Sequence, residues 1–306
     1  MRGKICSVSV SGSVNVSDLS IVNMAGYRFV SIPESQLRQL RIDLKAKADA
    51  CDLKGTILLS TEGINSFLAG SRDNIDAFVS YLRAIPKFSD IVYKESFTDY
   101  QPFNRMLVRL KKEIIPMNNA NIIPEKKTAP YISPEELKKW YQEKRDMIML
   151  DTRNDFEVSL GTFENAVDLN IAHFREFSDA VDLLPDGIKE KSIVTFCTGG
   201  IRCEKAAELM AQKGFKNVFQ LDGGILNYFE KCGGDFYNGE CFVFDQRVAV
   251  NSELKETQTK QCFDCRTPLP SGNAVCFNCG SNAVSKNMNR METPVVSPRS
   301  GDATSV

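Results

Sequence analysis

One short loop concentrates the residues of this chain that can do chemistry. Residues 197–203 read Cys-Thr-Gly-Gly-Ile-Arg-Cys, with a cysteine at each end and an arginine before the second. The apolar run at residues 192–196 predicts a buried strand before the loop, and the pattern of 203–213 predicts a helix after it. A thiol between a strand and a helix N-terminus faces backbone N–H groups that stabilise its thiolate. The loop therefore predicts a reactive Cys197, with Arg202 adding a permanent positive charge.

The length of this loop disfavours phosphoryl transfer as the reaction of the thiol. Four residues separate Cys197 from Arg202, whereas cysteine phosphatases place five there. A cradle one residue smaller suits a persulfide sulfur better than a phosphoryl group. The thiolate can carry sulfur or be oxidised to a sulfenic acid, and the residues leave both outcomes open. Thr198, Gly199, Gly200 and Ile201 form the rest of the cradle, and the two glycines give its backbone freedom.

The second cysteine of the loop has two interpretations. Cys203 falls in the first turn of the predicted helix. It is either a resolving thiol that works with Cys197 or a buried small apolar residue.

Four further cysteines near the C-terminus have the spacing of metal ligands. Cys262-x2-Cys265 and Cys276-x2-Cys279 are separated by ten residues that include Pro268, Pro270 and Gly272. Four thiolates can close a tetrahedral zinc site. The pattern predicts a structural zinc knuckle; the alternative is four free thiols in a flexible segment.

Histidine is scarce enough to exclude several redox sites. His173 is the only histidine in the sequence, so neither a two-histidine iron triad nor a three-histidine zinc site can be built. It lies in a segment that predicts an ordinary helix start. No motif for flavin, NAD or haem is present, so the Cys197 thiol is the evident redox group of the chain.

Positive charge is enriched in the first half of the chain. Residues 24–130 hold 16 Lys/Arg and 12 Asp/Glu, whereas residues 131–250 hold 14 and 21. The candidates for contact with a polyanion are Arg105, Arg109, Lys111 and Lys112, which flank or lie on a strand predicted at 107–115. The alternative for them is a solvated sheet face.

The elements that precede the loop indicate two domains. Strands are predicted at 27–32, 55–60, 64–69, 91–97 and 107–115, with helices at 34–51 and 73–85. This β-α-β-β-α-β order predicts a ferredoxin-like (acylphosphatase-like) α+β domain over residues 24–115, after a flexible extension at 1–23. Prolines 116, 124 and 130 mark a linker at 116–130.

Strands and helices then alternate, which predicts a parallel α/β sheet over residues 131–250. Ser133 and Pro134 form a helix N-cap, and strands are predicted at 147–151, 167–170, 192–197 and 217–221, with a helix at 174–184. A cysteine-rich segment at 251–280 and a disordered tail at 281–306 follow.

Composition favours a cytoplasmic protein with reduced thiols. No run approaches the ~18 apolar residues of a membrane helix, and no signal peptide is evident. The ten cysteines then do not form a disulfide framework, and those that lie in motifs are catalytic or metal-binding. Cys241 is predicted to be a core residue, and Cys6, Cys51 and Cys232 to be structural.

These motifs together resemble a known enzyme family. Asp151-Thr-Arg153, Glu157, Gly161, the loop 197–202 and Leu221-Asp-Gly-Gly resemble a rhodanese domain. The longer string FCTGGIRCEKA, with GYRFVSI, EGIN, PFNRMLVRLKKEI, FREF and GECFVFDQRVAV, resembles the rhodanese-containing tRNA uridine(34) hydroxylase family over about residues 24–280. One departure is Tyr237, where that family usually has tryptophan.

The resemblance implies oxygen-dependent hydroxylation of the wobble uridine of tRNA at C5, with Cys197 as the key residue. It gives molecular oxygen as co-substrate, tRNA as partner and a sulfur or electron donor as a further partner. Asp151 and Arg153 would brace the site. Two other functions remain open: a sulfurtransferase that carries a persulfide on Cys197, and a non-catalytic redox or RNA-binding module.

Overall fold

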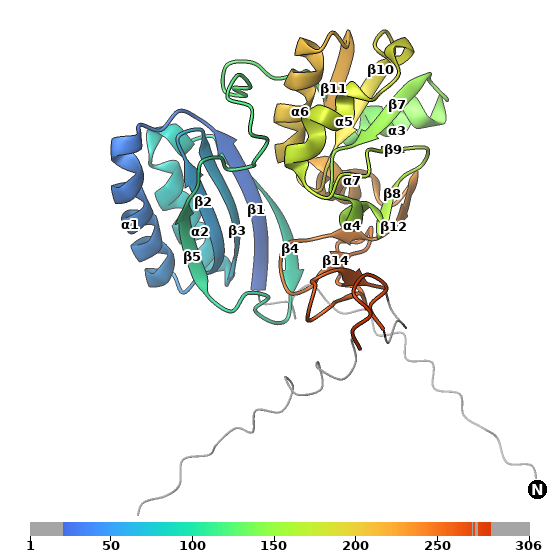
Figure 1. Cartoon of the computed structure of the whole chain (residues 1–306). Helices are drawn as coiled ribbons and strands as arrows, with labels where there is room; N and C mark the ends of the chain where they lie inside the picture. Colours follow the sequence, from blue (N-terminus) through green and yellow to red (C-terminus); the bar gives the residue numbers. More distant parts are fainter. Residues whose placement is uncertain (1–20, 271, 273–274, 283–306) are drawn as a thin grey trace, which may run out of the picture. The chain divides into compact units, whose positions relative to one another are not determined.

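The computed structural model describes residues 21–270, 272 and 275–282. The chain divides into two compact units, residues 1–257 and 258–306. The first unit contains two five-stranded sheets, each with its own apolar core. We call the part around the first sheet the first lobe and the part around the second sheet the second lobe (Figure 1).

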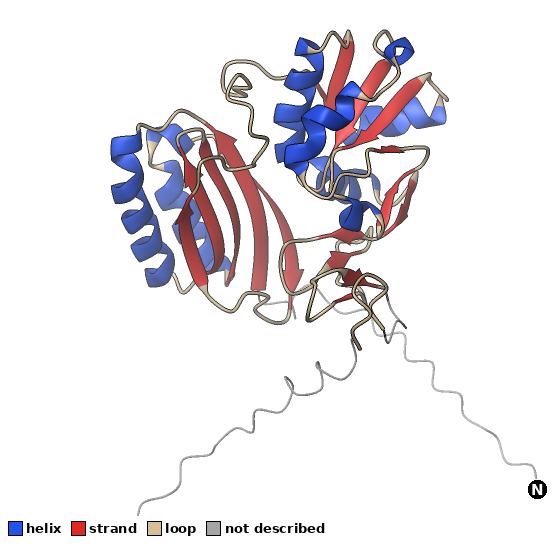
Figure 2. Ribbon diagram, in the orientation of Figure 1, coloured by secondary structure: helices blue, strands red, loops and turns tan. Residues whose placement is uncertain are grey.

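The first lobe is an antiparallel sheet with one added parallel strand. Its strands are β1 (Ile21–Phe29), β2 (Lys54–Ser60), β3 (Gly63–Gly70), β4 (Val92–Thr98) and β5 (Met106–Leu110), in the order β4-β1-β3-β2-β5. Strand β5 pairs in parallel with β2 at the sheet edge. Helices α1 (Glu34–Ala50) and α2 (Arg72–Arg83) cover one face (Figure 2) and are followed by a short 3-10 helix, η2 (Pro86–Phe88). The predicted ferredoxin-like arrangement is confirmed.

Alternation along the strands divides the side chains of this sheet between two faces. On β1, Val22 and Met24 pack into the core under the helices, so Asn23, Ala25 and Tyr27 lie on the opposite face. The helix-covered core therefore uses only one side of the sheet. The other side stays available to the rest of the unit.

The second lobe is a parallel sheet, as predicted, and its helices pack on both faces. Its strands are β6 (Tyr131–Ile132), β7 (Met147–Asp151), β9 (Val167–Asp168), β10 (Ser192–Phe196) and β11 (Asn217–Leu221), in the order β6-β11-β10-β7-β9. Its helices are α3 (Pro134–Gln142), α4 (Asp155–Val158), α5 (Phe177–Asp182), α6 (Ile201–Gln212) and α7 (Gly224–Cys232), with 3-10 turns η3 (Phe174–Glu176) and η4 (Asp186–Ile188). Helices α5 and α6 contribute to one core, and α3 and α7 to the other.

Small strand pairs complete both units. In the first unit, β8 (Gly161–Phe163) pairs with β12 (Tyr237–Gly239), and β13 (Cys241–Phe242) pairs with β14 (Ala249–Val250). In the second unit, β15 (Lys260–Gln261) pairs with β16 (Pro268–Leu269).

Several predicted boundaries were wrong for identifiable reasons. Strand β1 begins at Ile21, so residues 21–23 belong to the sheet rather than to the extension, and residues 1–20 lie outside the described residues. Strand β5 ends at Leu110, where its pairing with β2 ends at Leu59. The helix predicted at 174–184 is the turn η3 followed by the shorter helix α5.

The segments between and after the lobes also differ from the prediction. The linker at 116–130 buries Met117 and Ile122 in the second lobe's core, so it is packed structure rather than a spacer. Residues 251–257 belong to the first unit, where Glu256 bridges to Val250. Of the predicted tail, residues 283–306 lie outside the described residues.

Candidate active site

Cys197 lies at the carboxyl end of β10, directly before the loop that leads into α6. Its side chain is buried, with 1 % of its surface exposed. The backbone N–H of Gly200 donates a hydrogen bond to Cys197 Sγ at 3.1 Å. Gly200 has φ of 96°, which turns the loop toward the sulfur and suits glycine. The loop therefore encloses the sulfur with backbone donors, as predicted.

The surroundings of Cys197 favour its thiolate. Burial raises the pKa of Cys197, but a hydrogen bond from the Cys203 thiol, the Arg202 charge and the N–H groups of Arg202 and Gly200 outweigh burial and lower that pKa to about 5. The thiolate is the reactive form of cysteine. Cys197 is therefore ionised at neutral pH, ready to act as a nucleophile or to be oxidised.

Cys203 has the opposite character. It lies in the first turn of α6 with no exposed surface, and its Sγ is 3.8 Å from Thr152 Oγ1. Burial and the neighbouring Cys197 sulfur raise its pKa well above the ordinary value. The two cysteines thus form a buried pair in which one is a thiolate and the other a thiol that donates to it.

Arg202 is held by a buried carboxylate rather than free in the loop. Its Nη1 and Nη2 donate to Glu157 Oε2 and Oε1 at 2.5 and 2.8 Å. Glu157 also accepts from the N–H of Asn154 and the hydroxyl of Thr198. Burial raises the pKa of Glu157, but Arg202 outweighs burial, so the net shift is downward. This bidentate pair fixes the guanidinium at the loop and connects α6 to α4.

A second buried ion pair joins the strand before α4 to the residues that follow it. Asp151 and Arg153 are both fully buried, with Arg153 Nη2 2.6 Å from Asp151 Oδ2. Arg153 also donates to the Gly161 carbonyl at 2.6 Å, and Thr162 donates to Asp151 at 2.8 Å. The pair connects the end of β7 to β8 and so supports the segment that carries Glu157.

The rest of the cradle packs closely on its neighbours. Thr198 is buried, and Ile201 packs against Phe29 and Ile114 of the first lobe. A Cβ at Gly224 would lie 2.3 Å from the Cys197 carbonyl oxygen, so only glycine fits there, whereas a Cβ at Gly199 would meet nothing within 4 Å.

The first lobe contributes side chains to this site that sequence reasoning missed. Tyr27 on β1 donates to Glu204 Oε1 at 3.0 Å, and a Cβ at Gly200 would lie 3.1 Å from the Tyr27 hydroxyl. Lys94 on β4 lies with its ammonium 5.8 Å from the centre of the Tyr27 ring. Burial lowers the pKa of Lys94, and the Cys197 charge acts in the opposite direction. Tyr27 and Lys94 lie far from the loop in sequence, so no local sequence pattern predicts that they are part of the site.

Two successive residues of α6 bind the first lobe. Glu204 accepts from Tyr27 and, at 2.6 Å, from Tyr131 on β6. Lys205 is buried and donates to Glu62 at 3.0 Å and Glu113 at 2.6 Å. The helix that begins in the reactive loop is therefore attached to both lobes.

The C-terminal cysteines come together as predicted. The sulfur atoms of Cys262, Cys265, Cys276 and Cys279 all lie within 4.8 Å of one another. Cys262 and Cys279 are 3.7 Å apart, and Cys265 and Cys276 are 3.5 Å apart. A tetrahedral zinc with Zn–S bonds of about 2.3 Å separates its sulfurs by about 3.8 Å. The four residues therefore fit a metal ion.

The basic candidates lie on the surface of the first lobe. Arg105, Arg109, Lys111 and Lys112 are all exposed, at or near the edge strand β5. Lys111 and Lys112 line an open groove with Arg38. None of the four has a contact with the Cys197 loop among the described residues, so the structure places them in a separate region.

The remaining sequence candidates behave as ordinary structural residues. His173 is exposed and precedes η3. Cys241 is fully buried in the core, as predicted, and burial raises its pKa to about 12. Cys51 is also buried, Cys232 is half-buried, and Cys6 lies outside the described residues.

In the part of the chain that the structure describes, no helix has the length and apolarity to cross a bilayer.

Comparisons with known proteins agree with this architecture. Residues 21–114 match the model of the UPF0176 acylphosphatase like domain, and residues 133–231 match that of the rhodanese-like domain. The chain is 51 % identical over 253 residues to the tRNA uridine(34) hydroxylase of Cupriavidus pinatubonensis, covering 81 % of this chain and 89 % of that protein. It is 49 % identical over 279 residues to the tRNA uridine(34) hydroxylase of Paraburkholderia xenovorans, covering 85 % and 96 %. The chain, with its acylphosphatase-like lobe and its rhodanese loop at Cys197, belongs to the tRNA uridine(34) hydroxylase family.

Proposed function

We propose that this protein hydroxylates uridine 34 of tRNA at C5, with molecular oxygen as co-substrate and Cys197 as the catalytic residue. The observation that carries the proposal is the buried Cys197 sulfur, held as a thiolate by loop N–H groups and by Cys203. This chain, which carries the loop, is about half identical to proteins named for this reaction. Because tRNA is the proposed substrate, we also propose a cytoplasmic location.

The electron balance of this reaction gives Cys203 a role. Replacing C5–H by C5–OH uses one atom of dioxygen, and reducing the other atom to water takes two electrons and two protons. Oxidation of one thiolate and one thiol to a disulfide supplies both electrons and one of the two protons, and the second proton comes from solvent. We propose that Cys197 and Cys203 are these thiols and that an external thiol reductant restores them. The buried thiol beside a thiolate is the arrangement that this step requires.

Two buried ion pairs of the second lobe, Arg202–Glu157 and Arg153–Asp151, then have positioning roles. Glu157 holds Arg202 at the loop, where the guanidinium stabilises negative charge on Cys197. Asp151 and Arg153 connect the end of β7 to the start of β8, the two strands on either side of the helix α4 that carries Glu157. None of these four needs to exchange a proton during the reaction.

We propose that the tRNA backbone contacts the exposed basic residues of the first lobe. Arg105, Arg109, Lys111 and Lys112 offer positive charge at the edge of β5, and the groove beside Lys111 can hold a phosphate. Sequence-independent contacts of this kind position an RNA without reading its bases.

The reaction is tested by a single turnover with purified protein and unmodified tRNA. We expect 5-hydroxyuridine in the digested tRNA by mass spectrometry when oxygen is present and none in anaerobic buffer. Trypsin cleaves after Arg202, so Cys197 and Cys203 fall in separate peptides, residues 192–202 and 203–205. We expect these peptides to be disulfide-linked only after an aerobic turnover, and never in Cys203→Ala protein. A thiolated nucleoside in place of 5-hydroxyuridine would identify a sulfurtransferase instead.

We further propose that Cys262, Cys265, Cys276 and Cys279 hold a structural zinc ion. Metal analysis of the purified protein is expected to give about one zinc per chain. Cys265→Ser should lose the metal, whereas Cys232→Ser, which removes a cysteine outside the cluster, should keep it. Protein that contains no zinc and has four freely titratable thiols in this segment would refute the site.

A further inference from the structure

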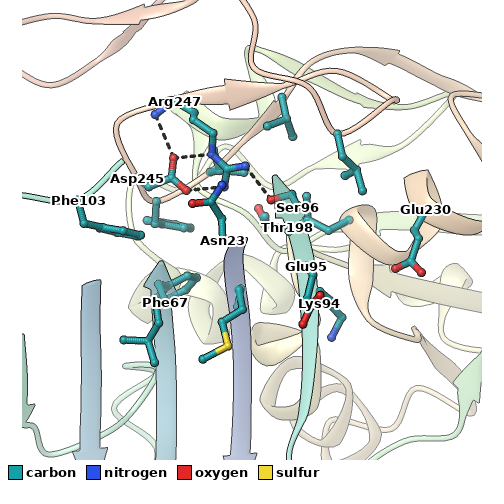
Figure 3. Close-up of a pocket in the computed structure, with 18 residues that line it drawn as sticks. Asn23, Phe67, Lys94, Glu95, Ser96, Phe103, Thr198, Glu230, Asp245 and Arg247 are labelled. Atoms are coloured by element: carbon teal, nitrogen blue, oxygen red, sulfur yellow. Dashed lines mark hydrogen bonds and ion pairs between the residues drawn. The ribbon is translucent and has the colours of Figure 1, made fainter. Parts of the chain in front are cut away.

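A pocket lies on the face of the first sheet that the helices leave uncovered (Figure 3). Asn23 on β1, Phe67 on β3 and Lys94 on β4 line it from the sheet. Its far wall includes Thr198, the residue directly after Cys197, and Phe244. The pocket thus borders the reactive loop, although sequence reasoning assigned it nothing.

Asn23, which lines this pocket, has a buried hydrogen-bond acceptor without a partner among the described residues. The side chain is 4 % exposed, and its Nδ2 donates to Thr98 Oγ1 at 3.0 Å. The Thr98 hydroxyl donates its own proton to the Tyr100 carbonyl at 2.7 Å. Thr98 Oγ1 can therefore only accept from Asn23, which fixes the orientation of the amide. Asn23 Oδ1 has no hydrogen-bond partner among the described residues.

A buried acceptor without a partner is unusual and indicates that something else supplies a donor. The Asn23 amide is on the pocket face of β1, opposite Ser96 of β4. The Ser96 hydroxyl accepts from Arg247 at 2.7 Å and makes no hydrogen bond to Asn23 Oδ1. A ligand that brings an N–H or O–H donor would satisfy Asn23 Oδ1.

The other side chains of the pocket suit a flat, polar ring. Phe67 and Phe244 lie with ring centres 5.8 Å apart, and Phe244 is 46 % exposed. Aromatic side chains of this kind pack against unstacked bases. Figure 3 shows Phe67 and Phe103 on one side of the pocket and Lys94 on the other.

Lys94 supplies a donor that is not neutralised by a contact ion pair. Arg247, the other cation of the pocket, is paired with Asp245 through Nε at 2.9 Å. Lys94 has no carboxylate within 4 Å in the described part of the chain; the charged groups that act on it at longer range are Asp222, Cys197, Glu204 and Glu230. Its ammonium is thus available to a carbonyl oxygen or to negative charge that develops on one.

We propose that this pocket binds the base of the substrate uridine, with Asn23 Oδ1 accepting from N3–H and Lys94 donating to a ring carbonyl. This proposal rests on the function proposed above. Uracil carries a proton at N3, whereas cytosine has a lone pair there and would face Asn23 Oδ1 as a second acceptor. The pocket therefore selects uracil, and it does so with residues of the first lobe.

The test is a cycle of protein and RNA substitutions. Synthetic anticodon stem-loops carry uridine, cytidine or 3-methyluridine at position 34, and their affinities are measured by fluorescence anisotropy. Wild-type protein is expected to bind the uridine RNA about tenfold more tightly than the other two. Asn23→Ala should bind all three within about twofold of one another. Asn121→Ala, at an exposed position, should keep the wild-type preference.

A second variant, Lys94→Met, separates a general loss of binding from a loss of preference for uridine. Lys94→Met leaves Asn23 in place, so it should weaken binding of all three RNAs and keep the preference for uridine. Folded Asn23→Ala protein, with an unchanged melting temperature, that still prefers uridine tenfold would overturn the proposal. So would wild-type protein that binds uridine and 3-methyluridine RNAs equally. Wild-type protein that shows the preference but forms no 5-hydroxyuridine would overturn the reaction and leave the pocket standing.

Discussion

Replacing Cys197 with serine is expected to abolish 5-hydroxyuridine formation by the purified protein, by on the order of a thousandfold or more. Serine matches cysteine in shape, so the loop and its Gly200 N–H contact should persist. A hydroxyl is neither ionised at neutral pH nor able to form a disulfide, so both properties that the reaction needs are lost. The measurement is nucleoside mass spectrometry after a single turnover.

The pH dependence of Cys197 alkylation checks the same thiol without tRNA. With a pKa lowered to about 5, the thiolate is nearly fully formed at neutral pH and declines as pH falls through that value. Iodoacetamide labelling of the peptide 192–202 should follow this curve. Cys232 is the internal control, because burial raises its pKa and its labelling should begin only at alkaline pH. A Cys197 midpoint near that of a free thiol, about 8.5, or a serine variant with substantial activity would contradict the assignment.

Replacing Glu157 with glutamine is expected to cost about 3–5 kcal/mol of unfolding free energy. The substitution leaves the buried Arg202 guanidinium without a counter-charge, and a buried charge without a partner is strongly destabilising. Urea denaturation of the two proteins measures the difference. Glu253→Gln is the matched control, because its pair with Lys255 is exposed and its loss should leave the unfolding midpoint unchanged.

The ion pair between Glu157 and Arg202 also predicts how the stability of the protein depends on pH. Arg202 holds the pKa of folded Glu157 below its ordinary value. The folded protein thus binds this proton less readily, so the pair stabilises fully above the unfolded pKa and loses its effect as pH falls through the folded pKa. The Glu157→Gln protein should therefore converge toward wild-type stability in acid. A stability difference that does not shrink in acid would assign the loss to packing.

Features that depend on a few neighbouring residues could be predicted from the sequence. The strand, glycine turn and helix around Cys197 follow from local apolar pattern and from the conformational freedom of Gly200. The Ser133 cap is confirmed, since its side chain accepts from the Glu136 N–H at 3.1 Å. The close approach of the four C-terminal sulfurs likewise follows from their paired spacing.

Features that depend on distant contacts could not be predicted in this way. The partner of Arg202 is Glu157, whose role no helix or strand period indicates. Tyr27 and Glu204 meet across 177 positions, and only the folded arrangement of the lobes brings them together. The acceptor of Asn23 is visible only once each neighbouring donor has been assigned. The chemistry of the loop is thus local, whereas its surroundings and its pocket are tertiary.

The attachment of α6 to the first lobe restricts how the two lobes can vary. Glu204 and Lys205 follow the reactive loop directly and bind Tyr27, Glu62 and Glu113. A chimaeric protein that joins the first lobe of one relative to the second lobe of another should remain active only if these five side chains are all present. The two lobes therefore cannot be exchanged independently between relatives, and the residues on the two sides of their contact are expected to change together.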